Sequence, residues 1–156
     1  RAVMRLVAND GSLVSLCLDD HRAMSLCDAK SLGKAVGAST QLIKLDLSSN
    51  NGCAGDAGFS ALCEGMERSS TLQHLRLGTL MVSTVAGARA LAKVMTSVHS
   101  MTSLDLSHCG LGDQACIVLS EEGVVYSTHL TQLNLSSNYL THSGLCCSVL
   151  HCVVVC

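Results

Sequence analysis

Histidine and cysteine are the residues of this sequence with the most chemical potential, since it holds seven histidines and ten cysteines. A metalloprotease places two histidines one helical turn apart as H-E-x-x-H, and no such segment occurs. The G-x-x-x-x-G-K-[ST] phosphate loop and the G-x-S-x-G nucleophile turn are also missing. Cys109 follows His108, but adjacent residues at a strand end point to opposite faces, so this pair is not a nucleophile with its base. We therefore predict no catalysis, no cofactor and no bound metal.

The last eleven residues pose a separate chemical question. Zinc binding by Cys146, Cys147, His151 and Cys152 is conceivable, although their spacing matches no known zinc-finger pattern. Palmitoylation of Cys146 or Cys147 is a second alternative. The interpretation we favour is truncation, in which the chain ends inside a structural unit and the tail is not native to the fold.

The elements that must position these residues follow from a repeated leucine pattern. Five copies of L-x-x-L-x-L, one of them with Met in first place, begin at residues 13, 42, 72, 101 and 130, so consecutive starts lie 29 or 30 residues apart. In the last four residues of each copy, leucine takes every second place, so each copy reads as a short strand. A polar turn and a helical stretch follow each copy. So regular a period predicts a repeat architecture.

The predicted helices share an apolar face at fixed offsets from the next strand. Positions thirteen, ten and six residues before a strand start fall on one side of a helix, and Ser120 is the one polar residue among them. The apolar members are Ala29, Leu32, Val36, Phe59, Leu62, Met66, Ala88, Leu91, Met95, Ile117 and Val124. A single unit cannot bury such a face, but stacked units can, with parallel strands on one side and helices on the other.

The full pattern L-x-x-L-x-L-x-x-N/C-x-L, with a period of about 29, resembles leucine-rich repeats. The long helical half of each unit is similar to the ribonuclease-inhibitor-like class. That resemblance implies an α/β horseshoe solenoid with strands on its concave face and helices on its convex face. We expect residues 1–145 to form the solenoid, as about five units plus a partial N-terminal one, and residues 146–156 to form an atypical tail. Both ends cut through a repeat, so we expect a piece of a longer array.

The ninth residue of each copy is expected to close the turn after the strand. An asparagine suits this place because its amide both donates and accepts hydrogen bonds to backbone groups. The turn positions are His21, Asn50, Leu80, Cys109 and Asn138. Leu80 cannot make such bonds, so the third turn is expected to be irregular or mobile.

The residues between the inward leucines should point out of the concave face. Because neighbouring strands lie about 4.8 Å apart, Arg76 should lie between Asp46 and Asp105. This row is either an ion-pair strip that offsets its own charges or a polar recognition strip. The candidate partner-binding residues are Lys44, Asp46, His74, Arg76, Ser103, Asp105, Gln132 and Asn134.

Charge and composition limit the partner and the location. A net charge of -2 offers no general attraction to nucleic acid or to an anionic membrane. No apolar run reaches the roughly 18 residues of a membrane helix. Ten cysteines without the spacing of a disulfide framework favour reduced thiols and a cytoplasmic setting, with the nucleus left open. We expect a monomer.

These observations predict a non-catalytic scaffold that binds a protein partner through its concave strand face. Two alternatives stay open. The chain could be a fragment of a larger regulator, such as a GTPase activator or an immune-sensor-type receptor, or a structural remnant without a ligand. The face has one arginine and no aromatic residue, whereas tight interfaces are enriched in both, so we expect a modest affinity.

Overall fold

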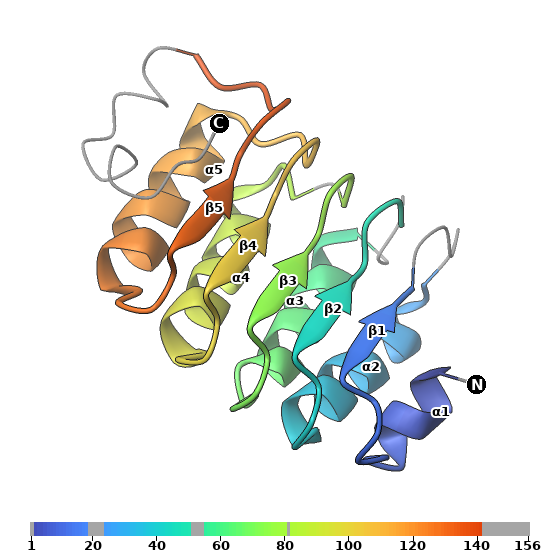
Figure 1. Ribbon diagram of the computed structural model, residues 1–156. Coiled ribbons are helices and arrows are strands. Elements are labelled where there is room, and N and C mark those ends of the chain that lie inside the picture. The colour runs from blue at the N-terminus through green and yellow to red at the C-terminus, as the bar shows by residue number, and fades with distance from the viewer. Residues whose placement is uncertain (1, 19–23, 51–54, 81, 142–156) are drawn as a thin grey trace.

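The computed structural model describes residues 2–18, 24–50, 55–80 and 82–141. Short strands alternate with helices along the chain (Figure 1). The elements are α1 (Ala2–Val7), β1 (Ser15–Cys17), α2 (Leu26–Ala38), β2 (Lys44–Asp46), α3 (Gly55–Met66), β3 (His74–Arg76), α4 (Val85–Ser97), β4 (Ser103–Asp105), α5 (Asp113–Val118), η1 (Leu119–Gly123), η2 (Val124–Tyr126) and β5 (Gln132–Asn134). Element η1 is a π-helical turn and η2 a 3-10 turn, and both continue α5.

The five strands form one parallel sheet in the order β1-β2-β3-β4-β5. Its register aligns the middle residues of the strands, which are Leu16, Leu45, Leu75, Leu104 and Leu133. Helices α2 to α5 cover one side of the sheet, and no described helix covers the other side, here called the strand face (Figure 1). The predicted α/β solenoid is confirmed.

The core lies between the sheet and the helices and is built almost entirely from aliphatic side chains. Leu72, Leu75 and Leu77 of the third unit are at most 1% exposed. They pack into one cluster with helix residues such as Leu62 and Leu91. Burying a leucine completely stabilises a fold by about 1.5–3 kcal/mol, so repeating the pattern in each unit supplies the main favourable free energy.

Helix α5 departs from the predicted register. Ile117 was expected in the core but is only partly buried, whereas Cys116 is fully buried and Leu119 is 3% exposed. Val124 is buried as predicted. The π-helical turn η1 accounts for the difference, because its wider winding takes up one extra residue between Leu119 and Val124.

The turns after β2, β3, β4 and β5 share one backbone conformation. Ser49, Thr79, His108 and Ser137 all have positive φ angles, between 56° and 68°. At the next residue, Asn50 is 1% exposed and its Nδ2 donates to the carbonyl oxygens of Leu18 (2.6 Å) and Leu47 (2.7 Å). The first of these oxygens belongs to the preceding unit, so the amide joins two units.

The third turn is regular at its described residues, so the expected irregularity at Leu80 was wrong there. Thr79 has a φ of 68°, and the backbone nitrogen of Leu80 donates to the oxygen of Leu77 at 2.9 Å. The Leu80 side chain is 2% exposed and joins the core. Thr79 supplies a polar contact instead, since its Oγ1 accepts a hydrogen bond from the Ser49 nitrogen at 2.7 Å. This bond also joins two units, but it satisfies a backbone nitrogen and not carbonyl oxygens of the kind to which Asn50 donates.

Helices α2 and α3 are in backbone contact. A Cβ atom placed on Gly33 would lie 2.5 Å from the oxygen of Leu62, and one on Gly37 or Gly65 would overlap backbone atoms of the facing helix. Glycine is therefore required at these positions for the two helices to lie so close.

Candidate protein-binding face

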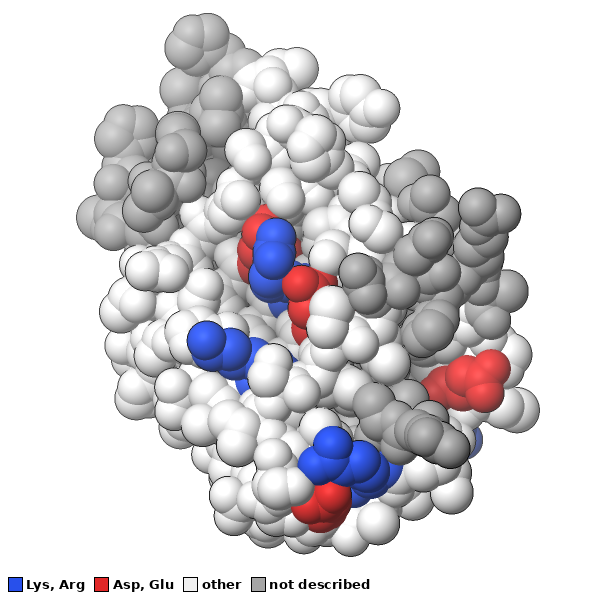
Figure 2. Space-filling view, turned by 45° about the vertical axis from the view of Figure 1, so that its right-hand side comes forward, with Lys and Arg blue, Asp and Glu red and all other residues white. Residues whose placement is uncertain are grey.

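Figure 2 shows the hollowed strand face, where acidic and basic side chains gather near its centre. The sheet register brings all the predicted partner-binding residues onto this face in two rows. The first row is Ser15, Lys44, His74, Ser103 and Gln132, and the central row is Cys17, Asp46, Arg76, Asp105 and Asn134. The register thus places Arg76 between Asp46 and Asp105, as the repeat spacing predicted.

Arg76 lies between two carboxylates in the central row. Its Nη1 is 3.2 Å from Oδ2 of Asp46, and its Nε is 3.5 Å from Oδ2 of Asp105. The arginine side chain is 60% exposed, so water screens both ion pairs. Exposed pairs of this kind contribute about 0–1 kcal/mol each to stability. The arrangement therefore orients the guanidinium more than it stabilises the fold.

Three side chains of the central row also cap the ends of their strands. Oδ1 of Asp46 accepts a hydrogen bond from the nitrogen of Ser48 at 3.0 Å, and Oδ1 of Asp105 accepts one from Ser107 at 2.9 Å. Oδ1 of Asn134 does the same for Ser136 at 3.0 Å. This shared local role was missed in the sequence, although its signal is visible there as Asp or Asn two residues before a serine.

A shallow hollow lies on the strand face over β4 and β5. Its volume is about 430 Å³, and its polar lining comes from Ser103, Asp105, Gln132, Asn134 and Ser136. Lys44 and Gln132 are exposed, and His74 is partly buried. The strand face therefore offers hydrogen-bond donors, acceptors and both signs of charge, on a backbone fixed by the sheet.

The cysteine in the turn after β4 does not have the surroundings of a reactive nucleophile. The Cys109 thiol is buried, and its Sγ donates to the oxygen of Leu77 at 3.2 Å. Burial, and to a smaller degree the charge of Asp105, raises the pKa of this thiol to about 12. His108 is exposed on the other side of the turn. Cys109 therefore stays a protonated thiol near neutral pH, whereas the thiolate is the reactive form of a nucleophilic cysteine.

The turn after β5 resembles the turn after β2. Asn138 repeats the role of Asn50, because its Nδ2 donates to the oxygens of Leu106 (2.8 Å) and Leu135 (2.9 Å). Its Oδ1 accepts from the nitrogen of Leu111 at 3.0 Å. His21 lies outside the described residues, as does the whole tail 146–156 with its zinc and palmitoylation alternatives.

Within residues 2–18, 24–50, 55–80 and 82–141, no three His, Cys, Asp or Glu side chains come together in a way that could hold a metal ion. The same ranges contain no helix with the length and apolar character needed to cross a membrane.

The parallel sheet, the helices on one side and the asparagine turn together define a leucine-rich repeat solenoid. A family model described as leucine-rich repeat matches residues 99–120 and 126–145. The chain is therefore a leucine-rich repeat protein. Its helices of 12 and 13 residues in α2 to α4 fit the ribonuclease-inhibitor-like class.

Among curated proteins, the chain is similar to NACHT, LRR and PYD domains-containing protein 3 of Rattus norvegicus. The two are 36% identical over 124 residues, which is 79% of this chain and 12% of that protein. The NACHT, LRR and PYD domains-containing protein 5 of Mus musculus is 32% identical over 156 residues, or 99% of this chain and 12% of that protein. The chain thus spans about an eighth of the length of these relatives.

Among solved structures, the fold is similar to the tropomodulin C-terminal domain of Caenorhabditis elegans. The TM-score is 0.72 with 19% identity, over 97% of this chain and 86% of that one. Actin-binding site 2 of leiomodin-1 gives a TM-score of 0.68 with 16% identity, over 86% and 76% of the two chains. At these identities the likeness concerns the fold alone.

Proposed function

We propose that this chain is a protein-interaction scaffold that binds a protein partner through its strand face. The observation that carries the proposal is the central row, in which the exposed guanidinium of Arg76 lies between the carboxylates of Asp46 and Asp105. Solenoids of stacked repeats commonly bind partners on the extended surface that their strands line. The family consists mainly of interaction modules, so we also propose that the scaffold is non-catalytic.

The chemistry of the strand face indicates what the partner must offer. The two rows are polar, so a matching surface needs charged or amide groups in register with strands spaced about 4.8 Å apart. A carboxylate on the partner would compete with Asp46 and Asp105 for Arg76 and could take both of its donor edges. Because this face lacks aromatic anchors in its two rows, the large apolar contacts of a tight interface would have to come from the partner.

Charge reversal on the strand face tests this proposal. Proteins captured by the wild-type chain would be compared with those captured by Arg76→Glu, with circular dichroism to check that the fold is kept. The matched control is Lys93→Glu, which changes the charge by the same amount on the exposed side of α4. Loss of a partner with Arg76→Glu alone supports the proposal. If every captured partner binds both variants equally well, the strand face is not the binding site.

A second candidate function is the leucine-rich repeat part of a larger immune-sensor-type regulator. The similarity to NACHT, LRR and PYD domains-containing protein 3 favours this over a GTPase activator. The reading frame that flanks Arg1 and Cys156 tests it. A phosphate-binding G-x-x-x-x-G-K-[ST] loop in the same frame would support the regulator, and a complete frame without one would remove it.

We also propose a cytoplasmic location and a monomeric chain. Cys109 is buried in the core and keeps a free thiol, which fits a reducing compartment. Fractionation of the tagged protein would test the location, with the nucleus as the alternative outcome. Light scattering at several concentrations would test the oligomeric state.

A further inference from the structure

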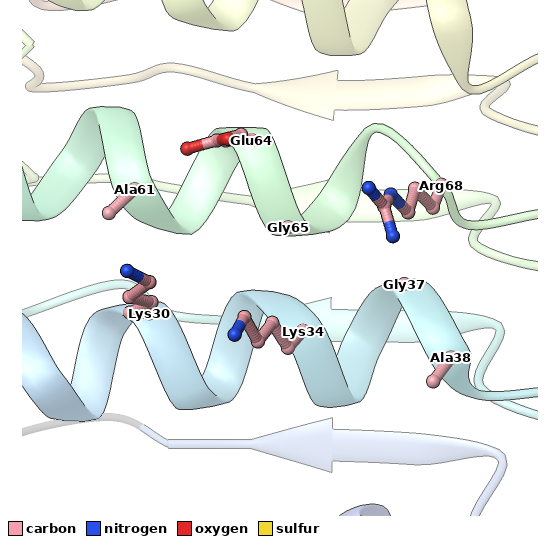
Figure 3. A pocket seen from close by; sticks show the side chains of 8 residues that line it. All are labelled: Lys30, Lys34, Gly37, Ala38, Ala61, Glu64, Gly65 and Arg68. Carbon is pink, nitrogen blue, oxygen red and sulfur yellow. The ribbon is translucent and has the colours of Figure 1, made fainter.

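A groove runs along the helical side of the molecule between α2 and α3, opposite the strand face (Figure 3). Its volume is about 600 Å³. The lining residues are Lys30, Lys34, Gly37, Ala38, Ala61, Glu64, Gly65 and Arg68. Glycine and alanine make its floor because the two helices are in backbone contact there, and long charged side chains form its walls. The groove therefore results from the close glycine contact between the two helices, and it is separate from the strand face.

The charges of this groove do not balance. Lys30, Lys34 and Arg68 bring three positive charges, and Glu64 brings one negative charge. In Figure 3, Lys30 of α2 and Arg68, two residues beyond the end of α3, extend toward the gap between the helices, while Glu64 runs along α3. Within the described parts of the chain, none of the three cations forms an ion pair. A chain with a net charge of -2 thus has a local excess of positive charge here.

The neighbouring groove, between α3 and α4, has no such excess of positive charge. Its lining includes Glu64, Glu67, Arg89 and Lys93, so its charges cancel. Arg89 is also engaged, because its Nε lies 3.0 Å from Oε2 of Glu122. The groove between α2 and α3 is the better place for a negatively charged ligand.

We propose that the groove between α2 and α3 is a second binding surface, which takes an acidic peptide segment of a protein partner. Lys30 and Lys34 lie one helical turn apart, about 6 Å, and can pair with two carboxylates spaced along a peptide. Arg68 lies on the other side of the groove, near Gly37, and can bind a further carboxylate through two parallel hydrogen bonds. The small floor residues let the peptide backbone approach the helices closely.

A narrow peptide fits the surrounding charges better than a membrane does. Glu67, just after α3, and Glu121 and Glu122 on η1 lie on the same helical side of the solenoid. A planar anionic bilayer that reached Lys34 would also approach these carboxylates, which would repel it. A peptide confined to the groove meets only Glu64.

The test uses a fluorescent peptide of alternating Glu and Ala, with the Gln–Ala peptide of the same length as its neutral counterpart. Fluorescence polarisation with the full chain at low and at physiological salt should show binding of the Glu–Ala peptide only. The double variant Lys34→Glu/Arg68→Glu should weaken this binding by about tenfold or more, since it replaces two attractions by two repulsions. Both residues are exposed, so the fold should be kept.

Three companion measurements make the result specific. Glu64→Gln removes the one acidic side chain of the lining and should tighten binding by roughly two- to threefold. Lys93→Glu, in the neighbouring groove, and Arg76→Glu, on the strand face, should change it by less than about twofold. Equal binding of the Glu–Ala and Gln–Ala peptides, or an equal loss with Lys93→Glu, would overturn the proposal. So would stronger binding to phosphatidylserine vesicles that the double variant abolishes, because the ligand would then be a membrane.

Discussion

At the scale of single residues, the asparagine of the turn does more than close its own strand. The Nδ2 of Asn50 bonds to an oxygen of its own unit and to one of the preceding unit, and Asn138 does the same. Each amide is thus a polar link between neighbouring units inside an otherwise apolar stack. Leu80 shows that one unit can do without this amide. Its side chain is buried in the core, and a different bond, from the Ser49 nitrogen to Oγ1 of Thr79, joins its unit to the preceding one.

Replacing Asn50 by alanine should destabilise the fold strongly. The change leaves the buried oxygens of Leu18 and Leu47 without their donor, which costs about 1–3 kcal/mol for each unsatisfied group. Urea unfolding would measure the loss. Asn134→Ala is the matched control, because that partly exposed amide caps its strand on the strand face and should cost less than about 1 kcal/mol. Equal losses in the two variants would show that the buried link has no special role.

Cys109 should resist alkylation at pH values where exposed cysteines react. Burial raises its thiol pKa to about 12, so almost no thiolate forms up to about pH 10. Cys17 and Cys27 are exposed. Labelling of the native chain with iodoacetamide at pH 8, read by peptide mass spectrometry, should modify Cys27 within the time in which Cys109 stays unmodified. In urea, which unfolds the chain, Cys109 should react as Cys27 does. Labelling of both at the same rate in the native chain would contradict the burial of Cys109.

At the scale of elements, the leucine spacing was enough to predict the strands and their register, because a period of two residues fixes which side chains point inward. The helix faces of α2, α3 and α4 followed from the same counting. In α5 the counting was wrong at Ile117, because a π-helical turn is not encoded in offsets measured from the next strand. The polar Ser120 at a core position was its only visible sign.

The strand face could be predicted from the sequence and the groove between α2 and α3 could not, for a physical reason. The rows of the strand face depend on strand register alone, so Arg76 could be placed between two carboxylates from the sequence. The groove between α2 and α3 depends on how closely two helices pack, and that distance is set by Gly33, Gly37 and Gly65 together. Each glycine alone is unremarkable in a sequence. Their facing positions became visible only once the two helices were placed side by side.

The first turn of α2 should lose stability in acid. Ser25 and Asp28 form a capping box, in which the Asp28 nitrogen donates to Oγ of Ser25 (3.2 Å) and the Ser25 nitrogen donates to Oδ2 of Asp28 (3.1 Å). The bond from the Ser25 hydroxyl, and then that from its backbone nitrogen, lower the pKa of Asp28 below its ordinary value of 3.8. The folded state therefore favours the carboxylate.

The sign of the pH dependence follows from that lowered pKa. As pH falls past about 3.8, the unfolded chain takes up the proton first, so the contribution of Asp28 to stability is present above this pH. It is lost as pH falls on through the folded pKa. Asp28→Asn should thus lower Tm at pH 7, and the difference from wild type should shrink toward pH 2. A Tm difference that stays constant from pH 7 to pH 2 would show that the charge of Asp28 has no part in the cap.

At the scale of the whole molecule, the units form a linear stack, in which each strand pairs only with the strand before it and the strand after it. Strand β3 lies in the middle of the sheet and has a neighbour on both sides. Helix α1 is at one end, and its Met4 and Val7 are 70% and 58% exposed while Leu6 is buried. Stability should therefore be greatest in the middle of the stack and should respond to a local defect mainly in the adjacent units.

Two leucine substitutions separate this behaviour from that of a single cooperative domain. Leu75 in β3 and Leu6 in α1 are 1% and 2% exposed, so replacement of either by alanine removes a similar side chain from a similar environment, at a cost of about 2–5 kcal/mol. Native-state hydrogen exchange should become faster in β2, β3 and β4 for Leu75→Ala. For Leu6→Ala it should become faster in α1 and β1 only, because the units beyond keep all of their contacts. If Leu6→Ala accelerates exchange equally as far as β5, the chain unfolds as one unit, and the strand face and the groove between α2 and α3 could not be altered independently.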